Sequence, residues 1–464
     1  MRRLNKELLN GAFEFPESLK VGTYPSHLPE KVIQFGEGNF LRAFVDWMFQ
    51  QMNKNGLFNG RVVVVQPLSH GFIPKLNEQD GLYTLILKGI RNGHAVAEEE
   101  IISSISRGIN LYTDWAEYLR CAENPDIEFI VSNTTEAGIA HNPSDRPDDQ
   151  PPASFPGKLA VYLYHRFKHF AGDPQKGMVI IPCELIDRNG DNLKRIILRL
   201  TQEWGLPAEF KEWVEKYNYF LNTLVDRVVP GYPRDELQEI TDRLGYEDHL
   251  LNTGELFHLW VIEGPRELQE RLPFTKVGLN VVWTDDLTPY RTRKVRILNG
   301  AHTSCVPVAF LYGLDTVGEM VDHPVLGQYT KEVIYKEIIP SIELDEKMLT
   351  EFAEAVLERF QNPYIKHYLI SILLNSTSKF KTRALPSLLR LIDKNGRVPE
   401  KLSFSLACLI ALYQGTVEGS SMKCRREQRE FTLQDDLHVL EFMQMAWAEW
   451  DNPELGVLAL VRKV

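Results

Sequence analysis

Apolar residues follow two different patterns along this chain, and the change between them divides it into two regions. In the first region, short runs rich in β-branched residues recur between turns, and the runs are continuous instead of alternating with polar residues. Continuous runs of this kind are typical of parallel strands that are covered on both faces. The runs are KVIQF (31–35), RVVVVQPL (61–68), IEFIVSNTT (127–135) and GMVIIPCEL (177–185).

Helical patterns separate these predicted strands. Segments 40–53 and 158–170 place apolar residues at helical spacing among polar ones. Strands that alternate with helices predict an α/β sheet. The stretch 141–157 is rich in Pro and Asp and could be an interdomain linker, but a strand-like run follows it, which favours a surface excursion within one domain.

The helical pattern dominates after about residue 275. Segment 346–360 carries an apolar stripe at helical spacing, and 403–415 is apolar enough for a buried helix. We therefore predict an α/β domain over residues 1–275 and a mainly α-helical domain over 276–464. The stripe consists of Leu349, Phe352, Ala353, Val356 and Phe360.

Composition narrows the class of protein. The chain has 464 residues, of which 44% are hydrophobic, enough for two or three domains with cores of their own. A net charge of −11 would repel a polyanion, so we expect no nucleic-acid partner. No apolar run is long enough to cross a membrane, and no apolar segment follows the basic N-terminus, so we expect neither a membrane span nor export.

Cysteine usage bears on the compartment and on metal binding. The five cysteines are scattered, odd in number and without a C-x-x-C pair. This pattern argues against a disulfide framework and against a structural zinc site, and it favours the reducing cytoplasm. The chain also lacks an H-E-x-x-H motif, so we expect no metal.

The first predicted strand runs into a glycine turn. In KVIQFGEGNFLRAF (31–44), glycines at 36 and 38 would let the backbone bend and approach a pyrophosphate at the N-terminus of the next helix, and Arg42 could reach a phosphate. Leu41 stands where a third glycine is usual, and a plain turn between strand and helix explains the pattern equally well. The candidate cofactor residues here are Phe35, Gly36, Gly38, Asn39, Phe40 and Arg42.

Two other strand ends bear on the cofactor. The second strand ends at Gln66, where a carboxylate would normally hold the ribose hydroxyls of NAD, so the choice between NAD and NADP stays open at this position. The motif SNTTEAG (132–138) offers Asn133, Thr134 and Glu136 at the carboxyl end of another strand. A capping turn is the alternative explanation for this motif.

The segment RKVRILNGAHTSCVPVAF (293–310) brings polar residues to the start of an apolar helix. At about 100° per residue, Lys294, His302 and Asn299 point to about 0°, 80° and 140° around the axis, on one side. This arrangement suggests the wall of a cleft. A lysine at a helix start, a capping asparagine and a hydrogen-bonded core histidine would give the same spacing.

This segment resembles the K-x-x-x-x-N-x-x-H signature of the mannitol dehydrogenase family, the polyol-specific long-chain dehydrogenases. FGEGNFLRAF (35–44) is similar to the family's cofactor turn, LVDRVVP (224–230) to its V-D-R motif, and NPYIKHYLISILLNSTSKF (362–380) to its C-terminal substrate helix. Motifs in this order over most of the chain are more specific than any one of them.

The resemblance implies a fold, a cofactor and roles for several residues. The fold would be a Rossmann-type N-terminal domain followed by a mainly α-helical C-terminal domain, with NAD as the cofactor and the site in the cleft between them. Lys294 would be the catalytic acid/base, Asn299 would stabilise the oxyanion, and His302 would position the substrate. Asp226 and Lys379 would also touch the substrate.

Departures from the family pattern point to a different substrate. The family usually has C-D-N after the fourth strand, whereas this chain has Cys183, Glu184 and Leu185, so the donor that the asparagine supplies is either missing here or comes from another residue such as Asn189. In the C-terminal helix an arginine is usual eight residues before the lysine, and here that position is Ser371. These changes, with several longer motifs, resemble a branch of the family that acts on sugar acids.

A sugar acid needs a counter-charge in its site. The sequence KFKTR supplies Lys379, Lys381 and Arg383 after a predicted helix with Asn362 as N-cap, and Lys366 and His367 are further candidates on that helix. A solvated basic turn is the alternative. We expect a small-molecule sugar acid as the partner and a monomer or small homo-oligomer. The alternatives are a reductase of the same family for the sister sugar acid D-fructuronate, a hexitol dehydrogenase, a redox-silent sugar-acid isomerase and a nucleotide-sensing protein that keeps the fold.

Overall fold

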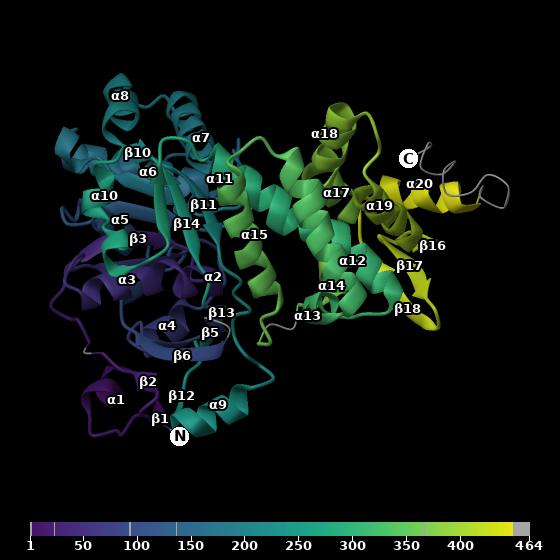
Figure 1. Cartoon of the computed structure of the whole chain (residues 1–464). Helices are drawn as coiled ribbons and strands as arrows, with labels where there is room; N and C mark the ends of the chain where they lie inside the picture. The colour runs from purple at the N-terminus through teal and green to yellow at the C-terminus, as the bar shows by residue number, and fades with distance from the viewer. Residues whose placement is uncertain (1, 23, 92–93, 136, 365–366, 449–464) are drawn as a thin grey trace. The chain divides into compact units, whose positions relative to one another are not determined.

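The computed structural model describes residues 2–22, 24–91, 94–135, 137–364 and 367–448 (Figure 1). It divides into two units. Unit 1 consists of Met1–Gly89 and Val96–Leu287, and unit 2 of Ile90–Ala95 and Thr288–Val464. Strand β15 (Val281–Thr284) pairs with β14 (Leu259–Glu263), so the second segment of unit 1 includes this strand and ends after it.

The centre of unit 1 is a parallel sheet of six strands in the order β10-β9-β8-β3-β4-β7. This is the strand order of a Rossmann fold, in which the first strand lies in the middle and the chain moves outward to each side in turn. The prediction of a Rossmann-type α/β domain is therefore confirmed. The strands are β3 (Glu30–Phe35), β4 (Arg61–Gln66), β7 (Ile105–Asn110), β8 (Phe129–Ser132), β9 (Val179–Pro182) and β10 (Tyr219–Phe220).

The carboxyl ends of β3, β4 and β8 lie side by side. Phe35 at the end of β3 pairs with Val65 on β4 and with Ser132 on β8. Open α/β sheets bind ligands beyond the carboxyl ends of their strands. The loops that follow these three strands therefore form the candidate cofactor site. The loop after β3 begins at Gly36, and the loop after β8 begins at Asn133.

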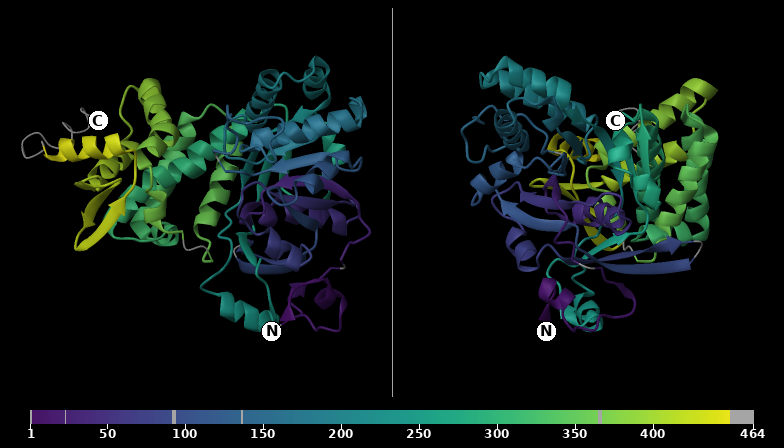
Figure 2. Two further views of the ribbon diagram at one scale, coloured as in Figure 1. Left: turned by 180° about the vertical axis from the view of Figure 1, so that it is seen from behind. Right: turned by 90° about the vertical axis from the view of Figure 1, so that its left-hand side faces the viewer.

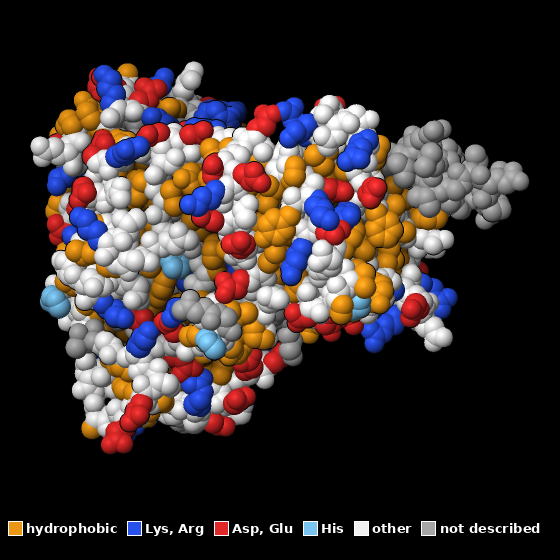
Figure 3. All heavy atoms as spheres, viewed as in Figure 1, with side chains coloured by type: hydrophobic (Ala, Val, Ile, Leu, Met, Phe, Trp, Pro, Cys, Tyr) orange, Lys and Arg blue, Asp and Glu red, His pale blue; other side chains and the backbone are white. Residues whose placement is uncertain are grey.

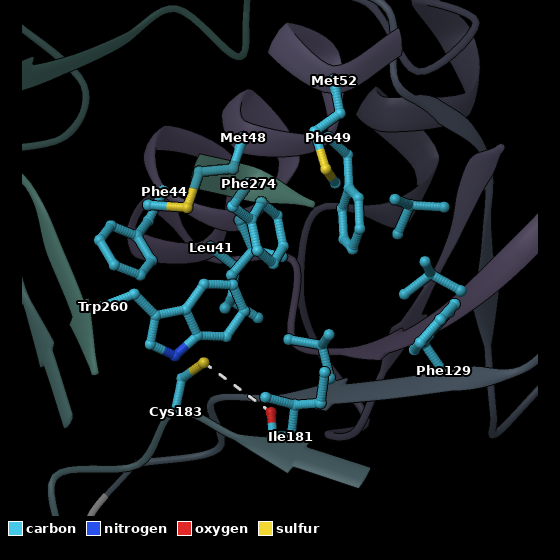
Figure 4. Close-up of a cluster of buried hydrophobic side chains, with 14 of the residues drawn as sticks. Leu41, Phe44, Met48, Phe49, Met52, Phe129, Ile181, Cys183, Trp260 and Phe274 are labelled. Carbon is cyan, nitrogen blue, oxygen red and sulfur yellow. Dashed lines mark hydrogen bonds between the residues drawn. The ribbon is translucent and has the colours of Figure 1, made fainter. Parts of the chain in front are cut away.

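One face of this sheet is covered by helix α3 (Val45–Lys54). Its Phe49 and Met52 belong to a buried cluster that also contains Trp260 and Phe274 (Figure 4). Burying a large apolar side chain such as Phe49 contributes roughly 1.5–3 kcal/mol. This packing fixes the helix that follows the glycine turn against the sheet.

The opposite face is covered by α5 (Trp115–Glu123), α6 (Phe155–His169) and α7 (Asn189–Glu203). Along β3 and β4, successive residues belong to alternate clusters: Val32 faces α3, whereas Ile33 faces these three helices. Because both faces are buried, apolar residues predominate on both sides of these strands. This is the physical reason for the continuous apolar runs in the sequence.

Three smaller sheets complete unit 1. They have the orders β11-β14-β15, β13-β5-β6-β2 and β1-β12. Strands β5 and β6 form an insertion between β4 and β7 that the sequence analysis did not predict. The remaining elements of this part of the chain are β1 (Arg2–Arg3), α1 (Lys6–Asn10), β2 (Leu19–Lys20), α2 (Asn39–Ala43), α4 (Ile73–Glu78), β5 (Tyr83–Arg91), β6 (His94–Ile102), η1 (Pro174–Lys176), α8 (Ala208–Tyr217), β11 (Asn222–Asp226), α9 (Leu237–Leu244), β12 (Tyr246–Glu247), β13 (Asn252–Glu255), α10 (Leu268–Arg271) and η2 (Phe274–Val277).

Unit 2 is mainly helical, as predicted, and α12 (Gly300–Tyr312) lies at its centre. This helix packs against α14, α16, α17 and α19, so nearly all of its residues are buried. Two further predicted helices are confirmed, at α15 (Glu346–Phe360) and α19 (Glu400–Leu412). The other helices are α11 (Thr288–Arg293), η3 (Lys294–Asn299), α13 (Val317–Asp322), α14 (Pro324–Glu332), η4 (Val333–Ile338), η5 (Ile339–Ser341), α16 (Leu369–Ile372), α17 (Ser376–Arg383), α18 (Leu385–Asn395) and α20 (Leu437–Ala448).

Two features of unit 2 differ from the sequence-based expectations. An antiparallel sheet of β16 (Gly415–Glu418), β17 (Ser421–Arg426) and β18 (Arg429–Leu433) lies beside α20 and was not predicted (Figure 2). The predicted helix with Asn362 as its N-cap is wrong. The Asn362 side chain instead accepts a hydrogen bond from the Tyr364 N–H (3.1 Å) in a turn, and the first helix of this segment is α16.

Charges of both signs are interspersed over the face shown in Figure 3. In the ranges that the structure describes, no helix is both long and apolar enough to traverse a lipid bilayer. The same ranges contain no group of three or more His, Cys, Asp and Glu side chains arranged to hold a metal ion. All five cysteines are free thiols.

Candidate functional site

The glycine turn after β3 has the backbone geometry that its sequence suggests. Gly36 has φ +118°, a conformation that side chains rarely adopt, and a Cβ there would lie 2.9 Å from the Asn133 carbonyl oxygen. Glycine is therefore required at position 36. At Gly38 a Cβ would meet nothing within 4 Å, so the backbone at the N-terminus of α2 faces open space. This is a cradle in which a pyrophosphate can approach backbone N–H groups.

Arg42 is bonded to this turn. Its side chain is buried and donates hydrogen bonds to the Glu37 carbonyl (3.1 Å) and to Oδ1 of Asn39 (2.7 Å), and a third goes to the Leu250 carbonyl. These bonds tie the turn to the start of α2. The structure therefore gives Arg42 a positioning role, and its contact with a phosphate stays a prediction. Phe35 is buried in the sheet, and Phe40 packs against Phe44.

The loop after β8 lies against the glycine turn. The Asn133 N–H donates to the Phe35 carbonyl (3.0 Å), and its side-chain amide donates to the Cys183 carbonyl (3.2 Å). The N–H and hydroxyl of Thr134 both donate to Oε1 of Glu184, at 3.0 and 2.9 Å. The third residue predicted in this loop, Glu136, lies outside the described residues. The structure thus brings Asn133 beside Gly36, as the sequence predicts.

Lys294 and Asn299 occupy a π-helical segment. The chain runs from α11 through the π-helix η3 into α12 without a break, and η3 begins at Lys294 and ends at Asn299. A π-helix joins residues five apart, which is the spacing of these two side chains, so the angles calculated at 100° per residue do not apply. Single π-helical turns within α-helices are rare and frequently occur at functional sites. Lys294 and Asn299 are both half-buried.

His302, on the first turn of α12, lies in an aromatic and cationic cluster. Its ring stacks on Phe360 (centroids 4.3 Å apart) and meets His367 edge-on (5.1 Å). Its Nε2 is buried and has no hydrogen-bond partner among the described residues. Burial lowers the pKa of His302 well below its usual value, and the positive charges of nearby side chains act in the same direction. A neutral imidazole with a free Nε2 can exchange a hydrogen bond with a substrate hydroxyl.

The other residues predicted on the substrate segment are placed as follows. Lys379 donates from Nζ to the Ile372 carbonyl (2.9 Å), and burial together with the charge of Arg383 lowers its pKa. His367 lies against His302. Lys381 is exposed, and Lys366 lies outside the described residues. The cluster thus joins His302, His367, Lys379 and Arg383 in one place within unit 2.

Comparisons with known proteins connect these features. Residues 30–276 match the model of the mannitol dehydrogenase Rossmann domain, and residues 286–446 match that of the mannitol dehydrogenase C-terminal domain. The chain belongs to the mannitol dehydrogenase family. Among curated relatives, an altronate oxidoreductase of Bacillus subtilis is 49% identical over 93% of this chain and 87% of its own length. An altronate oxidoreductase of Escherichia coli is 49% identical over 93% and 88%, respectively.

Solved structures support the same family fold. Mannitol 2-dehydrogenase of Pseudomonas fluorescens, in a ternary complex with NAD and D-mannitol, matches with a TM-score of 0.71 and 23% identity over 96% of this chain and 89% of its own. A D-sorbitol dehydrogenase without substrate matches with a TM-score of 0.77 and 21% identity, over 90% and 87%. At these identities the likeness shows the fold alone. The family assignment rests on the matched domains and the curated relatives.

The V-D-R motif of this family member ends β11 in unit 1. Asp226 is buried at the end of that strand. The Arg227 guanidinium donates to the carbonyls of Phe257 (3.0 Å) and Leu256 (3.1 Å) and lies over the Trp47 ring (4.3 Å). Burial lowers the pKa of Arg227 to about 9. The arginine therefore holds the backbone that carries Asp226, which stays a predicted substrate contact.

Asn189 does not replace the family's usual asparagine. Its side-chain amide donates to the carbonyls of Pro182 (3.0 Å), Glu184 (3.1 Å) and Thr223 (3.2 Å). Its oxygen accepts from the Thr223 N–H (2.9 Å), and the residue is fully buried. Because these bonds occupy the amide, the expectation that Asn189 donates to a substrate oxygen is wrong. At the position of the family's asparagine, Leu185 is exposed.

A buried carboxyl group lies beneath the glycine turn. Nε2 of Gln34 donates both to Oδ2 of Asp46 (3.1 Å) and to the Gly36 carbonyl (3.1 Å). Burial raises the pKa of Asp46 to about 7, although the hydrogen bond from Gln34 and the charge of Arg42 oppose this. In an unfolded chain an aspartate has a pKa near 3.9. Between about pH 4 and pH 7 the folded state binds this proton more strongly, so the stability falls as the pH rises.

We expect Asp46→Asn to reduce this pH dependence, because asparagine is neutral at every pH and similar in shape. From pH 5 to pH 8 the free energy of unfolding of the unmodified chain should fall by about 1–3 kcal/mol more than that of the variant. Urea unfolding at the two pH values measures this difference. Asp126→Asn, at an exposed position of the same unit, is the control. An equal pH dependence of all three proteins would contradict the assignment.

Glu37 and Glu184 are functional candidates that the sequence analysis did not include. Glu184 is buried and accepts hydrogen bonds from the Ser132 hydroxyl (3.0 Å) and from Thr134, so it shapes the loop after β8. In the sequence, Glu184 could have been recognised as an acid at the carboxyl end of a predicted buried strand. Glu37 lies between the two glycines of the turn. The sequence alone does not indicate a function for this residue, because the residues that surround it in the structure are distant in the chain.

Proposed function

We propose that this chain is an NAD-dependent oxidoreductase that interconverts D-tagaturonate and D-altronate. The observation that carries the proposal is the 49% identity to altronate oxidoreductases over 93% of the chain. The π-helical segment with Lys294 and Asn299, followed by His302, supports a proton-transfer site in unit 2. The glycine turn and the open backbone at Gly38 fit a dinucleotide in unit 1.

Each residue of the substrate site has one task in this proposal. NAD, when bound, supplies the acceptor of the hydride in oxidation, and NADH supplies its donor in reduction. Lys294 gives a proton to the substrate oxygen during reduction and removes it during oxidation. Asn299 donates a hydrogen bond to the same oxygen, and His302, held neutral by burial, binds a neighbouring hydroxyl through Nε2.

The acid/base role makes a demand on the lysine. A lysine with the ordinary pKa near 10.4 is neutral in only about one molecule in 10³ at pH 7, so it removes protons poorly. Desolvation and neighbouring cations lower the pKa of a lysine. Lys294 is half-buried, which supports the desolvation that this role requires.

The carboxylate of the sugar acid is met by the cationic residues around His302. Lys379 and Arg383 both lie close enough to this ring to depress its pKa, and His367 touches it. A polyol has no carboxylate and needs no such charge. Lys379 and Arg383 offer a counter-charge for the carboxylate of a sugar acid, and Ser371, where the family usually has arginine, shows that the polyol pocket is altered.

A substrate panel tests the proposal. The purified chain should oxidise NADH rapidly with D-tagaturonate, and at least about tenfold more slowly, by kcat/KM, with D-fructuronate or D-fructose. The decrease in NADH absorbance is the measurement, with D-altronate and NAD as the reverse assay. Preference for D-fructuronate would show that the chain reduces this sister sugar acid instead. Preference for fructose would show that the enzyme does not select its substrate by a carboxylate.

A further inference from the structure

The second strand of the Rossmann sheet ends without an acid. In NAD enzymes a carboxylate at this strand end accepts hydrogen bonds from the adenosine ribose, and in NADP enzymes an arginine accommodates the 2′-phosphate. Here β4 ends at Gln66. Gln66 is buried, donates to the Leu68 carbonyl (2.9 Å) and accepts weakly from the Ile73 N–H (3.4 Å), so its side chain serves its own loop.

The structure brings a different acid to this strand end. Gly71, in the loop after β4, has no side chain, and a Cβ there would overlap Oε1 of Glu37 and lie 2.6 Å from Oε1 of Gln66. The Glu37 carboxylate and the Gln66 amide thus converge on one point beside Gly71. Glu37 comes from the glycine turn after β3, so the acid reaches the end of β4 from the neighbouring strand.

The surroundings hold this carboxylate in place but leave it accessible. Glu37 is half-buried. Burial raises the pKa of the Glu37 carboxyl, whereas the N–H groups of Glu37 and Phe72 and the charges of Arg42 and His70 favour the ionised form. The loop therefore supplies donors that fix the carboxylate and stabilise its charge.

The same loop presents two apolar side chains to the solvent. Leu68 is 55% exposed and Phe72 is 45% exposed, on either side of Gly71. Exposed large apolar residues beside an organised polar group are typical of a surface that binds a flat aromatic ligand. They lie on the loop where the adenosine of a dinucleotide bound at the glycine turn would be placed.

We propose that Glu37 is the residue that selects NAD over NADP, a proposal that rests on the dinucleotide binding in the proposed function. Its carboxylate accepts hydrogen bonds from the adenosine ribose hydroxyls, the task that Gln66 does not perform. A 2′-phosphate in the same place would bring two negative charges together, and the site rejects it for that reason. A side chain at position 71 would have to displace this carboxylate.

Direct binding of NADH and NADPH to the full chain tests this inference, with nicotinamide fluorescence as the readout and without substrate. In Glu37→Gln, the ratio of the two dissociation constants should change in favour of NADPH by about 10- to 100-fold, the range expected for losing a hydrogen bond to a charged group. Glu37→Asp keeps the charge but shortens the reach, so it should weaken NADH while still rejecting NADPH.

The control is Glu78→Gln, which removes one negative charge from the exposed end of α4, where Glu78 pairs with Arg3 (2.7 Å). Thermal unfolding establishes that each variant is folded. A ratio within twofold of the unmodified chain in Glu37→Gln would overturn the inference, even if tagaturonate is reduced normally. A Glu37-dependent preference without tagaturonate turnover would support it and reject only the proposed substrate. Binding of neither dinucleotide by the unmodified chain would overturn both.

Discussion

We expect Lys294→Ala to lower kcat by about 10²- to 10⁴-fold in both directions of the proposed reaction, the range typical for loss of a general acid/base. Without the amine, the substrate oxygen must exchange its proton with water, while the dinucleotide turn in unit 1 is untouched. Steady-state turnover of D-tagaturonate with NADH measures the loss. The dissociation constant of NADH should stay within about twofold, because Lys294 has no proposed role in binding the cofactor.

Two comparisons separate a proton-transfer role from damage to the fold. Lys347→Ala removes a lysine whose side chain is 83% exposed on α15, and it should leave turnover unchanged. Adding a small primary amine should restore part of the activity of Lys294→Ala but none to an inactive, misfolded protein. Near-normal turnover in a folded Lys294→Ala protein would remove the acid/base assignment.

We expect Asn299→Ala to lower kcat by about 10²- to 10³-fold, because it removes a donor to the developing oxyanion. KM should change less than kcat, because the hydrogen bond strengthens as negative charge develops on the oxygen. Asn299 ends the π-helical segment, five residues after Lys294, so the two side chains can act on one atom. Steady-state kinetics with D-tagaturonate at saturating NADH give both parameters.

The matched control is Asn395→Ala at the exposed C-terminal end of α18, which should be kinetically silent. Circular dichroism of both variants checks that unit 2 keeps its helical content. If Asn299→Ala changed KM and kcat/KM but left kcat intact, the residue would bind the substrate equally in ground and transition states, and the oxyanion role would fail.

Much of the architecture was predictable because it rests on local patterns. The continuous apolar runs of β3, β4, β8 and β9 reflect burial on both faces, and helix α15 has the bounds that its apolar stripe predicts. The β16–β18 sheet carried a detectable signal that was missed. Along β17 the buried residues Met422, Cys424 and Arg426 alternate with Lys423 and Arg425, which is the period of a strand.

Other positions could not be assigned from the sequence, because their roles depend on partners distant in the chain. Arg42 looked able to reach a phosphate, yet one of its hydrogen bonds goes to the Leu250 carbonyl, 208 residues away. The sequence suggested that Asn189 could donate a hydrogen bond to the substrate. In the structure its amide is bonded to the backbone of β9 and β11. Helix periodicity likewise gave no warning that the backbone at Lys294 is π-helical.

The sequence by itself determined the layered α/β domain, the helical domain after it, the glycine turn and the family signature, because apolar periodicity and short motifs are local properties of a chain. Only the tertiary structure decided which polar side chains are hydrogen-bonded within the fold and which are left to face a ligand. Glu37 illustrates the difference: its carboxylate reaches the end of β4 because parallel strands end at one edge of the sheet, although Gln66 comes 29 positions later in the sequence.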